Sequence, residues 1–275
     1  MDLASIMSAN PFRVDPDVSP DEALALMDDH DVRHLPVVEH GELIGIVSDR
    51  DLLSEIGWLP ARTPEQRKAR ATQGCVSSIR PLMHVDVTTG EPADSVVTAA
   101  VDLVVQAIGC LPVVDQGELV GMVTEMDLAA AFWRISQKGE LDGDVDPPVL
   151  EHMAKHPVTV GFTTPIRQAV ALCKEHHVRH LPVADGERLV GVVSDRDLRA
   201  ATAGGKHLEQ AVGTIMVPYP VTLATDARLS DAAERMVGHR ISCLPVVEGE
   251  RLVGIITLTD LLDHCLSTLR DPETH

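Results

Sequence analysis

A hydroxyl residue followed three positions later by a carboxylate, Ser/Thr-x-x-Asp, recurs four times in the same context in this 275-residue chain. Each copy follows a short apolar run that contains a glycine, so we expect it where a strand passes into a helix. A helix N-terminus favours an anion such as a phosphate. The hydroxyl adds a donor, and the Asp can accept hydrogen bonds from two ribose hydroxyls. The copies are Ser48/Asp51, Thr124/Asp127, Ser194/Asp197 and Thr257/Asp260.

The same pattern has a purely structural interpretation. A Ser or Thr at the N-cap and a carboxylate in the first turn both stabilise a helix, and this alone could explain every copy. Capping would tolerate Glu, Asn or Ser at the later position, whereas all four copies carry Asp. Both interpretations stay open, and the uniformity favours a nucleotide site.

The motifs end a longer internal repeat. A Leu-Pro-Val-Val or Leu-Pro-Val-Ala segment precedes each motif, with ten residues from its Leu to the glycine and sixteen to the Asp in every copy. The copies begin 76, 70 and 63 residues apart, beyond the roughly 20–50 residues of most solenoid repeats. Each unit is therefore a small subdomain rather than one layer of a solenoid.

The four copies are alike in pairs. Repeats 1 and 3 share Val-Arg-His before Leu-Pro and Ser-Asp-Arg-Asp at the end, whereas repeats 2 and 4 share Cys before Leu-Pro and Thr-x-x-Asp. We infer that a module of two repeats was duplicated whole. The functional unit is then a pair, repeats 1 and 2 or repeats 3 and 4.

Each unit is predicted to fold as β-α-β-β-α. The Leu-Pro segment and the glycine-containing run are β-rich and flank a tight turn, which indicates a hairpin. Helical patterns precede and follow that hairpin. Extended runs are expected further upstream at 12–14, 85–87, 158–160 and 221–223.

The domain boundaries follow from this pattern. Units are expected at 1–57, 76–134, 148–203 and 212–270. They form modules 1–134 and 148–270, with a charged, proline-containing linker at 139–148. Segment 60–74 is a linker or an extra helix, and its basic stretch 62–70 is either a solvated face or a docking surface for an acidic partner.

Composition argues against several function classes. Forty-two acidic against 23 basic residues give a formal charge of −19, a field that repels nucleic acid and anionic lipid. The sequence has no apolar run that predicts a membrane helix, and its first residues lack the features of a signal peptide. The five cysteines form no Cys-x-x-Cys pair, which agrees with a reducing compartment. We therefore expect a cytoplasmic protein.

The unit resembles the CBS domain, named after cystathionine β-synthase, and a pair of units resembles a Bateman module. The resemblance rests on Leu-Pro-Val-Val, on Gly-h-h-Ser/Thr-x-x-Asp (h is apolar) and on an upstream Ile-Met, seen as Ile6-Met7 and Ile215-Met216, with Met153 in repeat 3. Repeat 2 departs, with Ile79-Arg80-Pro81 where Ile-Met is expected. The resemblance implies an α+β fold of four CBS units paired into two Bateman modules, arranged as a pseudo-symmetric disc.

The resemblance also implies a ligand class. Clefts in such modules bind adenosyl ligands, so AMP, ADP or ATP is expected, with S-adenosylmethionine or NAD(H) as the alternative. The Ser/Thr is expected on phosphate, the Asp on ribose, and the residues before Leu-Pro on the wall of the site. A Thr before the first helix often contacts ligand, and only repeat 3 has it, as Thr164. The residues before Leu-Pro are Arg33, His34, Gly109, Cys110, Arg179, His180, Ser242 and Cys243.

Local charge ranks the four sites. Repeats 1 and 3 carry Arg and His before Leu-Pro and a further Arg50 or Arg196 inside the motif, and arginine suits phosphate recognition. Repeat 4 is neutral there, and Glu125 disfavours polyphosphate in repeat 2. The expected order is Ser194/Asp197, Ser48/Asp51, Thr257/Asp260 and Thr124/Asp127.

Other residues have simpler interpretations. His152 and His156, and the cluster at His176, lack a recognisable ligand pattern, so no metal site is expected. Cys110 and Cys243 are interpreted as buried small residues rather than redox sensors. Trp58 and Trp133 follow the last helices of repeats 1 and 2 and are expected to pack at a module interface.

No catalytic set is recognisable, since Gly-x-Ser-x-Gly, a P-loop and a Cys/His pair at useful spacing do not occur. We therefore expect a regulatory or sensor protein, not an enzyme, with an adenine nucleotide as regulatory ligand and no catalytic cofactor. Its partner would be a regulated enzyme or transporter. Homodimerisation or pairing of the modules within one chain is expected. A ligand-independent scaffold and an enzyme with an unrecognised site are the alternatives.

Overall fold

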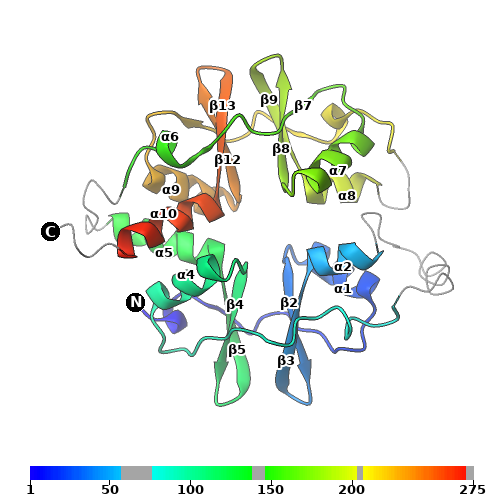
Figure 1. Cartoon of the computed structure of the whole chain (residues 1–275), viewed down its shortest axis with the longest axis vertical. Coiled ribbons are helices and arrows are strands. Elements are labelled where there is room, and N and C mark those ends of the chain that lie inside the picture. The colour runs from blue at the N-terminus through cyan, green and yellow to red at the C-terminus, as the bar shows by residue number, and fades with distance from the viewer. Residues whose placement is uncertain (57–75, 138–145, 203–206, 271–275) are drawn as a thin grey trace.

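The computed structural model describes residues 1–56, 76–137, 146–202 and 207–270. Within them each repeat contains a helix, a β-hairpin and a second helix, so the α+β fold class is confirmed (Figure 1). In chain order these elements are α1 (Pro20–Asp29), β2 (His34–Glu39), β3 (Glu42–Ser48) and α2 (Asp49–Ile56); α4 (Val96–Val105), β4 (Cys110–Asp115), β5 (Glu118–Thr124) and α5 (Glu125–Gln137); α7 (Ile166–Glu175), β8 (His180–Asp185), β9 (Arg188–Ser194) and α8 (Asp195–Thr202); α9 (Leu229–His239), β12 (Cys243–Glu248), β13 (Arg251–Thr257) and α10 (Leu258–Arg270).

A leading segment precedes these elements in each repeat. In repeats 1, 3 and 4 it holds a helical turn and one or two very short strands. These are η1 (Leu3–Ser5) and β1 (Ser8–Ala9); α6 (Val149–His152), β6 (Ala154–Lys155) and β7 (Val160–Gly161); η2 (Val212–Thr214), β10 (Val217–Pro218) and β11 (Leu223–Ala224).

The hairpin turns fix the register of each strand pair. In repeat 1 both central turn residues, His40 and Gly41, have positive φ (54° and 91°). Gln116 and Gly117 have φ of 50° and 90° in repeat 2. Such type I′ turns match the right-handed twist of the strands. In these two hairpins the Leu of Leu-Pro, Leu35 or Leu111, lies on the buried face.

The leading segments interlock the repeats in pairs. β1 of repeat 1 pairs with β5 of repeat 2, and β6 and β10 cross in the same way to β13 and β9. Within the described residues this gives a five-stranded sheet in module 1 and an eight-stranded sheet in module 2. Repeat 2 contributes an isolated bridge from His84 to Ile46 in the same way, so each leading segment pairs with the hairpin of the other repeat in its module.

A methionine of each leading segment packs on the motif glycine of the paired repeat. A Cβ on Gly45 would lie 2.8 Å from the Met83 sulfur, and one on Gly121 would lie 2.3 Å from that of Met7. Met153 and Met216 stand in the same way against Gly254 and Gly191. The expectation that repeat 2 departs at Ile79-Arg80-Pro81 is therefore wrong, because Met83 makes the equivalent contact.

The upstream extended runs are confirmed in part. Val14 bridges Val37 in parallel, and β7 and β11 pair in parallel with β8 and β12. In repeat 2 the bridge is made by Gly90 with Val113, not by residues 85–87, and Val85 is 63% exposed. A Cβ at Gly90 would lie 2.7 Å from Leu3. A glycine adds no apolar residue to the sequence pattern, which is why the pattern did not predict this bridge.

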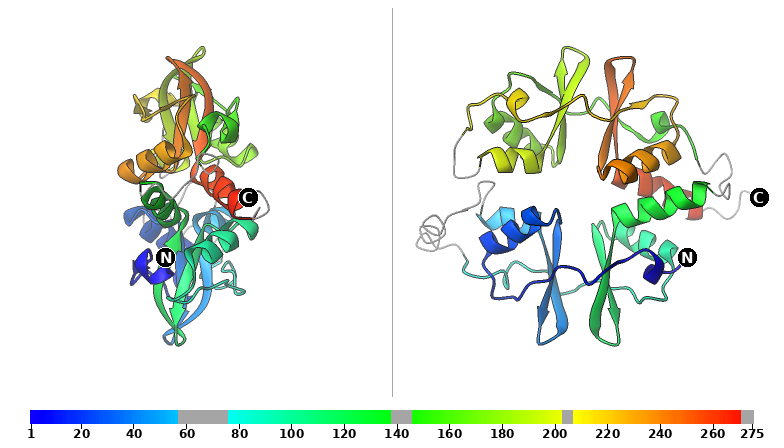
Figure 2. Two further views of the ribbon diagram at one scale, coloured as in Figure 1. Left: turned by 90° about the vertical axis from the view of Figure 1, so that its left-hand side faces the viewer. Right: turned by 180° about the vertical axis from the view of Figure 1, so that it is seen from behind.

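The two modules pack against each other within the chain as a flattened disc (Figures 1 and 2). Helices α1 and α2 of repeat 1 face α7 and α8 of repeat 3, and α4 and α5 of repeat 2 face α9 and α10 of repeat 4 (Figure 1). The module contact therefore has two halves, made by like repeats.

The contact between repeats 2 and 4 is an apolar seam. Ala129 and Phe132 of α5 share one core cluster with Leu229, Ala233 and Met236 of α9. Trp133 packs against the same cluster, as expected for a tryptophan at a module interface, while Trp58 lies outside the described residues. The contact between repeats 1 and 3 is of a different kind and belongs to the candidate site.

Candidate functional site

The four Ser/Thr-x-x-Asp motifs adopt one geometry. In repeat 3 the Ser194 backbone N–H and hydroxyl donate to Asp197 Oδ2 at 2.9 and 2.6 Å, and the Asp197 N–H donates back to Ser194 Oγ at 3.1 Å. The other three motifs repeat the first two bonds within 0.1 Å. The capping interpretation therefore fits every copy, and each hydroxyl already gives its single proton to its own Asp.

The second carboxylate oxygen distinguishes the copies. In Asp51, Oδ1 lies 3.2 Å from His84 Nε2. Within the parts of the chain that the structure describes, Oδ1 of Asp127, Asp197 and Asp260 takes no hydrogen bond. These side chains are half-buried. An open carboxylate oxygen at a helix start is the acceptor that a ribose diol requires.

The residues before Leu-Pro meet across each module. A Cβ on Gly109 would lie 2.6 Å from His34 Cε1, and Ser242 Oγ lies 3.4 Å from His180 Nε2. Burial lowers the pKa of both histidines to about 4. At neutral pH they are therefore uncharged rings beside the Asp residues rather than cations for a phosphate.

The two cysteines before Leu-Pro are buried, and burial raises the pKa of Cys110 and Cys243 to about 12. This agrees with their interpretation as small core residues, because the thiolate is the reactive form. Thr164 Oγ1 accepts a hydrogen bond from the Gly161 N–H at 3.0 Å, so this hydroxyl still has its proton to donate.

The arginines before Leu-Pro connect the two modules. Arg33 lies 3.2 Å from Asp49 of its own repeat and 3.5 Å from Asp195 of repeat 3. Arg179 lies 3.4 Å from Asp49 in return. The carboxylates are almost fully buried and the arginines half-buried. We call this contact between repeats 1 and 3 the ionic seam.

The arginines inside the motifs also cross the ionic seam. Arg50 donates to the His177 carbonyl at 3.4 Å, and Arg196 donates to the Val32 carbonyl at 3.1 Å and pairs with Asp31. In this structure both guanidinium groups are engaged with the opposite module. Their contact with a ligand phosphate stays a prediction.

Asp49, Asp195 and Arg199 were missed by the sequence reasoning. Arg199 is 1% exposed and lies 3.0 Å from Asp195 and 3.7 Å from Asp49. The signal for the two carboxylates was present, since Ser-Asp-Arg-Asp occurs only in repeats 1 and 3. Nothing in one sequence shows that the first Asp of that motif faces another module.

The even repeats meet through their motifs as well. Thr259 donates to Glu125 at 2.9 Å across the module contact, and burial is the main cause that raises the pKa of Glu125. Among the described residues no group of three His, Cys, Asp or Glu side chains is arranged to hold a metal ion. The helices described there are also too short or too polar to cross a membrane.

Comparison with known proteins gives one family. The CBS domain model matches residues 3–57, 76–134, 148–204 and 212–267. Protein MJ1404 of Methanocaldococcus jannaschii is 28% identical over 282 residues, 95% of this chain and 61% of that protein. The CBS domain-containing protein YhcV of Bacillus subtilis is 34% identical over 114 residues, 41% of this chain and 81% of YhcV.

A solved structure shares the whole fold. MJ1225 of M. jannaschii is 26% identical over 266 residues, 88% of this chain and 91% of that protein. Its crystal structure matches with a TM-score of 0.75 at 21% identity, over 96% of this chain and 99% of that one. The chain spans about three-fifths of MJ1404 and a third of the meiotically up-regulated gene 70 protein of Schizosaccharomyces pombe.

Proposed function

The chain belongs to the CBS domain family, and from this premise we propose that it is a regulatory protein that binds adenosyl ligands, with AMP, ADP or ATP preferred. The observation that carries the proposal is the open oxygen of the motif carboxylates. Capping uses only Oδ2, and Oδ1 of Asp197 remains available to a ribose. S-adenosylmethionine and NAD(H) present the same ribose and are the alternative ligands.

The Ser194/Asp197 site leads the order. Asp197 lies near the uncharged ring of His180, which follows Arg179, and Thr164 of the same repeat keeps a donor. The Ser48/Asp51 site comes second because His84 already faces the Asp51 oxygen. The Thr257/Asp260 and Thr124/Asp127 sites follow, the latter with Glu125 beside it.

The proposed mechanism is a shift between arrangements of the modules. Arg179 belongs to the predicted Ser194/Asp197 site and also bonds Asp49 of the other module. A phosphate that draws Arg179 away would weaken the ionic seam and favour a different arrangement. A regulated enzyme or transporter would read that change, and no catalytic step is needed.

The test is Asp197→Asn. The Asn carbonyl oxygen can keep the two bonds that Oδ2 accepts, while its NH₂ group replaces the open oxygen by a donor. Capping therefore survives and ribose binding does not. We expect affinity for the preferred nucleotide, measured by calorimetry on nucleotide-free protein, to fall about 10- to 100-fold, since a hydrogen bond to a charged group contributes about 1.5–3 kcal/mol.

The matched control is Asp231→Asn. Asp231 Oδ2 caps α9 by accepting the Arg228 N–H at 2.8 Å, outside the predicted sites. It should change stability as Asp197→Asn does and leave affinity unchanged. Unaltered affinity of Asp197→Asn would contradict the ribose role. If AMP, ADP, ATP, S-adenosylmethionine and NADH all fail to bind the wild type, the ligand-independent scaffold is favoured instead.

A further inference from the structure

Helix α4 of repeat 2 presents a row of valines to solvent. Val97, Val101 and Val105 are spaced by four residues, so they lie along one face of the helix. Val97 is 45% exposed and Val105 is 57% exposed, while Val101 between them is half-buried. The opposite face, with Ala99 and Leu103, belongs to a core cluster. We call the three valines the valine row.

The other repeats supply a comparison for this row. Helices α1, α7 and α9 begin fifteen residues before the Leu of their Leu-Pro segments, as α4 does, so their positions correspond one to one. In each of them the row carries at least one charged residue and no apolar residue larger than alanine. The equivalents are Asp21, Ala25 and Asp29 in α1, Arg167, Ala171 and Glu175 in α7, and Ser230, Glu234 and Gly238 in α9. The fold of the repeat therefore does not require valine at these positions.

Valine is also unfavourable at an exposed helical position. It is a weaker helix former than the alanine, glutamate and arginine that occupy this row in other repeats. Helix α4 has five valines among its ten residues and a single charge, on Asp102, whose carboxylate accepts a hydrogen bond from Gln106 at 3.3 Å. Since exposure and helix propensity both disfavour the valines, a contact that buries them explains their presence.

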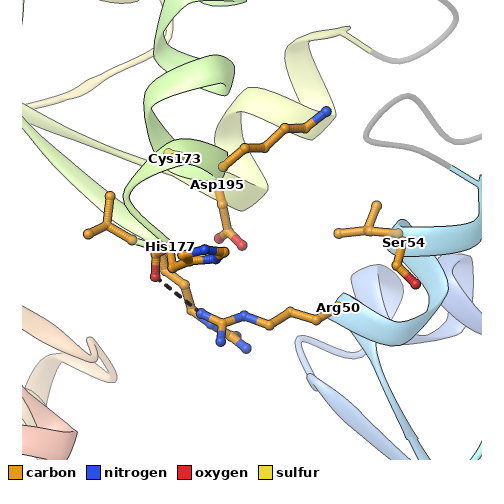
Figure 3. Close-up of a pocket in the computed structure, with 9 residues that line it drawn as sticks. Arg50, Ser54, Cys173, His177 and Asp195 are labelled. Carbon is orange, nitrogen blue, oxygen red and sulfur yellow. Dashed lines mark hydrogen bonds between the residues drawn. The ribbon is translucent and has the colours of Figure 1, made fainter.

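The equivalent helix of repeat 3 ends at a contact of another kind. Beyond the end of α7, the His177 carbonyl accepts a hydrogen bond from Arg50 of α2, close to Asp195 (Figure 3). That contact joins two repeats of one chain through charged groups. Helix α4 instead lies beside α10 on one side of the disc, with α5 and α9 on the other (Figure 2). Its buried face shares a cluster with Leu262 of α10, so the valine row continues the apolar contact between repeats 2 and 4 to the surface.

We propose that the valine row is a contact between two copies of this chain. The row is symmetric about Val101, so pairing around a two-fold axis brings Val101 against its counterpart and forms a self-complementary surface. Ridges of residues four apart are the ones that interdigitate most often when two helices cross. Valine also loses little side-chain freedom on burial, because a helix already restricts its rotamer.

Charge favours a second copy over a basic partner. The valine row is uncharged, and two chains of charge −19 approach most readily where their surfaces carry no charge. Carboxylates along the row would favour a basic partner, but the two nearest in the sequence, Asp94 and Asp102, already accept hydrogen bonds within repeat 2. A helix of this length spans about 15 Å, which offers less than the roughly 800 Å² per partner of a standard interface. We therefore expect a weak dimer that forms at high protein concentration.

The test is sedimentation equilibrium of the full chain between about 1 µM and about 1 mM. We expect the average mass to rise with concentration from 29.6 kDa toward twice that value. Raising the salt from about 0.05 to about 0.5 M should strengthen the dimer, because salt screens the repulsion between two acidic chains and leaves an apolar contact intact. A mass of 29.6 kDa throughout would overturn the proposal and leave the valine row to a different protein.

A double variant places like charges in the contact. Val97→Glu with Val105→Glu should raise the dissociation constant of the dimer at least about tenfold. Both valines lie outside the core cluster and glutamate is the better helix former, so the variant should keep its fold, which thermal unfolding checks. Val101→Glu, the residue that α9 carries as Glu234, should weaken the dimer in the same way.

The matched control is Ala25→Glu with Ala171→Glu. It adds the same charge at exposed positions of the same row in α1 and α7, and it should dimerise as the wild type does. A dimer of unaltered strength in both valine variants would refute the assignment of this face. Affinity for the adenosyl ligand should be the same in all of these proteins, so the proposal and the proposed function stand or fall separately.

Discussion

Replacement of Asp49 by Asn tests whether the ionic seam holds the modules together. The Asp49 side chain is 1% exposed, and its oxygens lie 3.2 Å from Arg33, 3.4 Å from Arg179 and 3.7 Å from Arg199. Two of these arginines belong to the other module. Because Asn has nearly the same shape, the change removes the charge and keeps the packing volume.

The expected loss follows from burial. Neutralising one partner of a buried ion pair costs about 3–5 kcal/mol, because the remaining charge stays buried without compensation. Arg33 and Arg179 are 24% exposed, and Asp195 still faces Arg33 and Arg199, so the lower end applies. A loss of about 3 kcal/mol lowers Tm by roughly 6–12 °C for a domain of about this size.

The assay is a double-mutant cycle with Arg199→Leu, which introduces the residue that repeat 1 carries as Leu53. Thermal unfolding of both single variants and the double variant gives the coupling. We expect the double variant to lose at least about 1 kcal/mol less than the sum. Additivity within about 0.5 kcal/mol would refute the seam as a coupled network. Glu39→Gln, which breaks an exposed pair with Arg80, should leave Tm almost unchanged.

Two further predictions concern the residues before Leu-Pro. Because the folded pKa of His34 and of His180 is about 4, below the ordinary 6.5, the unfolded chain binds more protons between these values. The contribution of each histidine to the free energy of unfolding should be fully present above pH 6.5 and fall by about 3 kcal/mol toward pH 4. The plot of Tm against pH should be flatter in the variant with both histidines replaced by Gln. An unchanged plot in that variant would contradict the assignment. Gly109→Ala should cost about 1–3 kcal/mol, because its Cβ would meet the His34 ring at 2.6 Å, whereas Gly238→Ala, with open space around it, should be neutral or stabilising. Equal Tm for the two alanine variants would refute the close contact.

The order of elements in each repeat could be predicted from the sequence because its signals are local. Alternating apolar residues and a pair such as His40-Gly41 specify a hairpin without reference to the rest of the chain. The contact between Met83 and Gly45 is tertiary, and it constrains only the methionine and the glycine. A sequence pattern that requires Ile directly before Met therefore does not predict the contact that Met83 makes.

The candidate site could be predicted less completely. The Asp residues of the motifs lie where a strand passes into a helix, as the spacing indicates, and their hydrogen bonds follow from that position. The roles of Arg50 and Arg196 depend on which repeat stands opposite, and both donate to carbonyl groups of the other module. Positive charge near a motif suits a phosphate and a buried carboxylate equally, so composition alone does not decide between them.

The alternation of the repeats has a structural cause in the disc. Repeat 1 faces repeat 3 and repeat 2 faces repeat 4, so a module packed on its own duplicate makes a self-complementary contact. Such a contact needs each residue pair in both directions, as Arg33 with Asp195 and Arg179 with Asp49 provide. The likeness of odd repeats to each other is therefore a requirement of the interface as well as a trace of duplication. Leu53, which stands where repeat 3 has Arg199, is one of the positions at which that symmetry is broken.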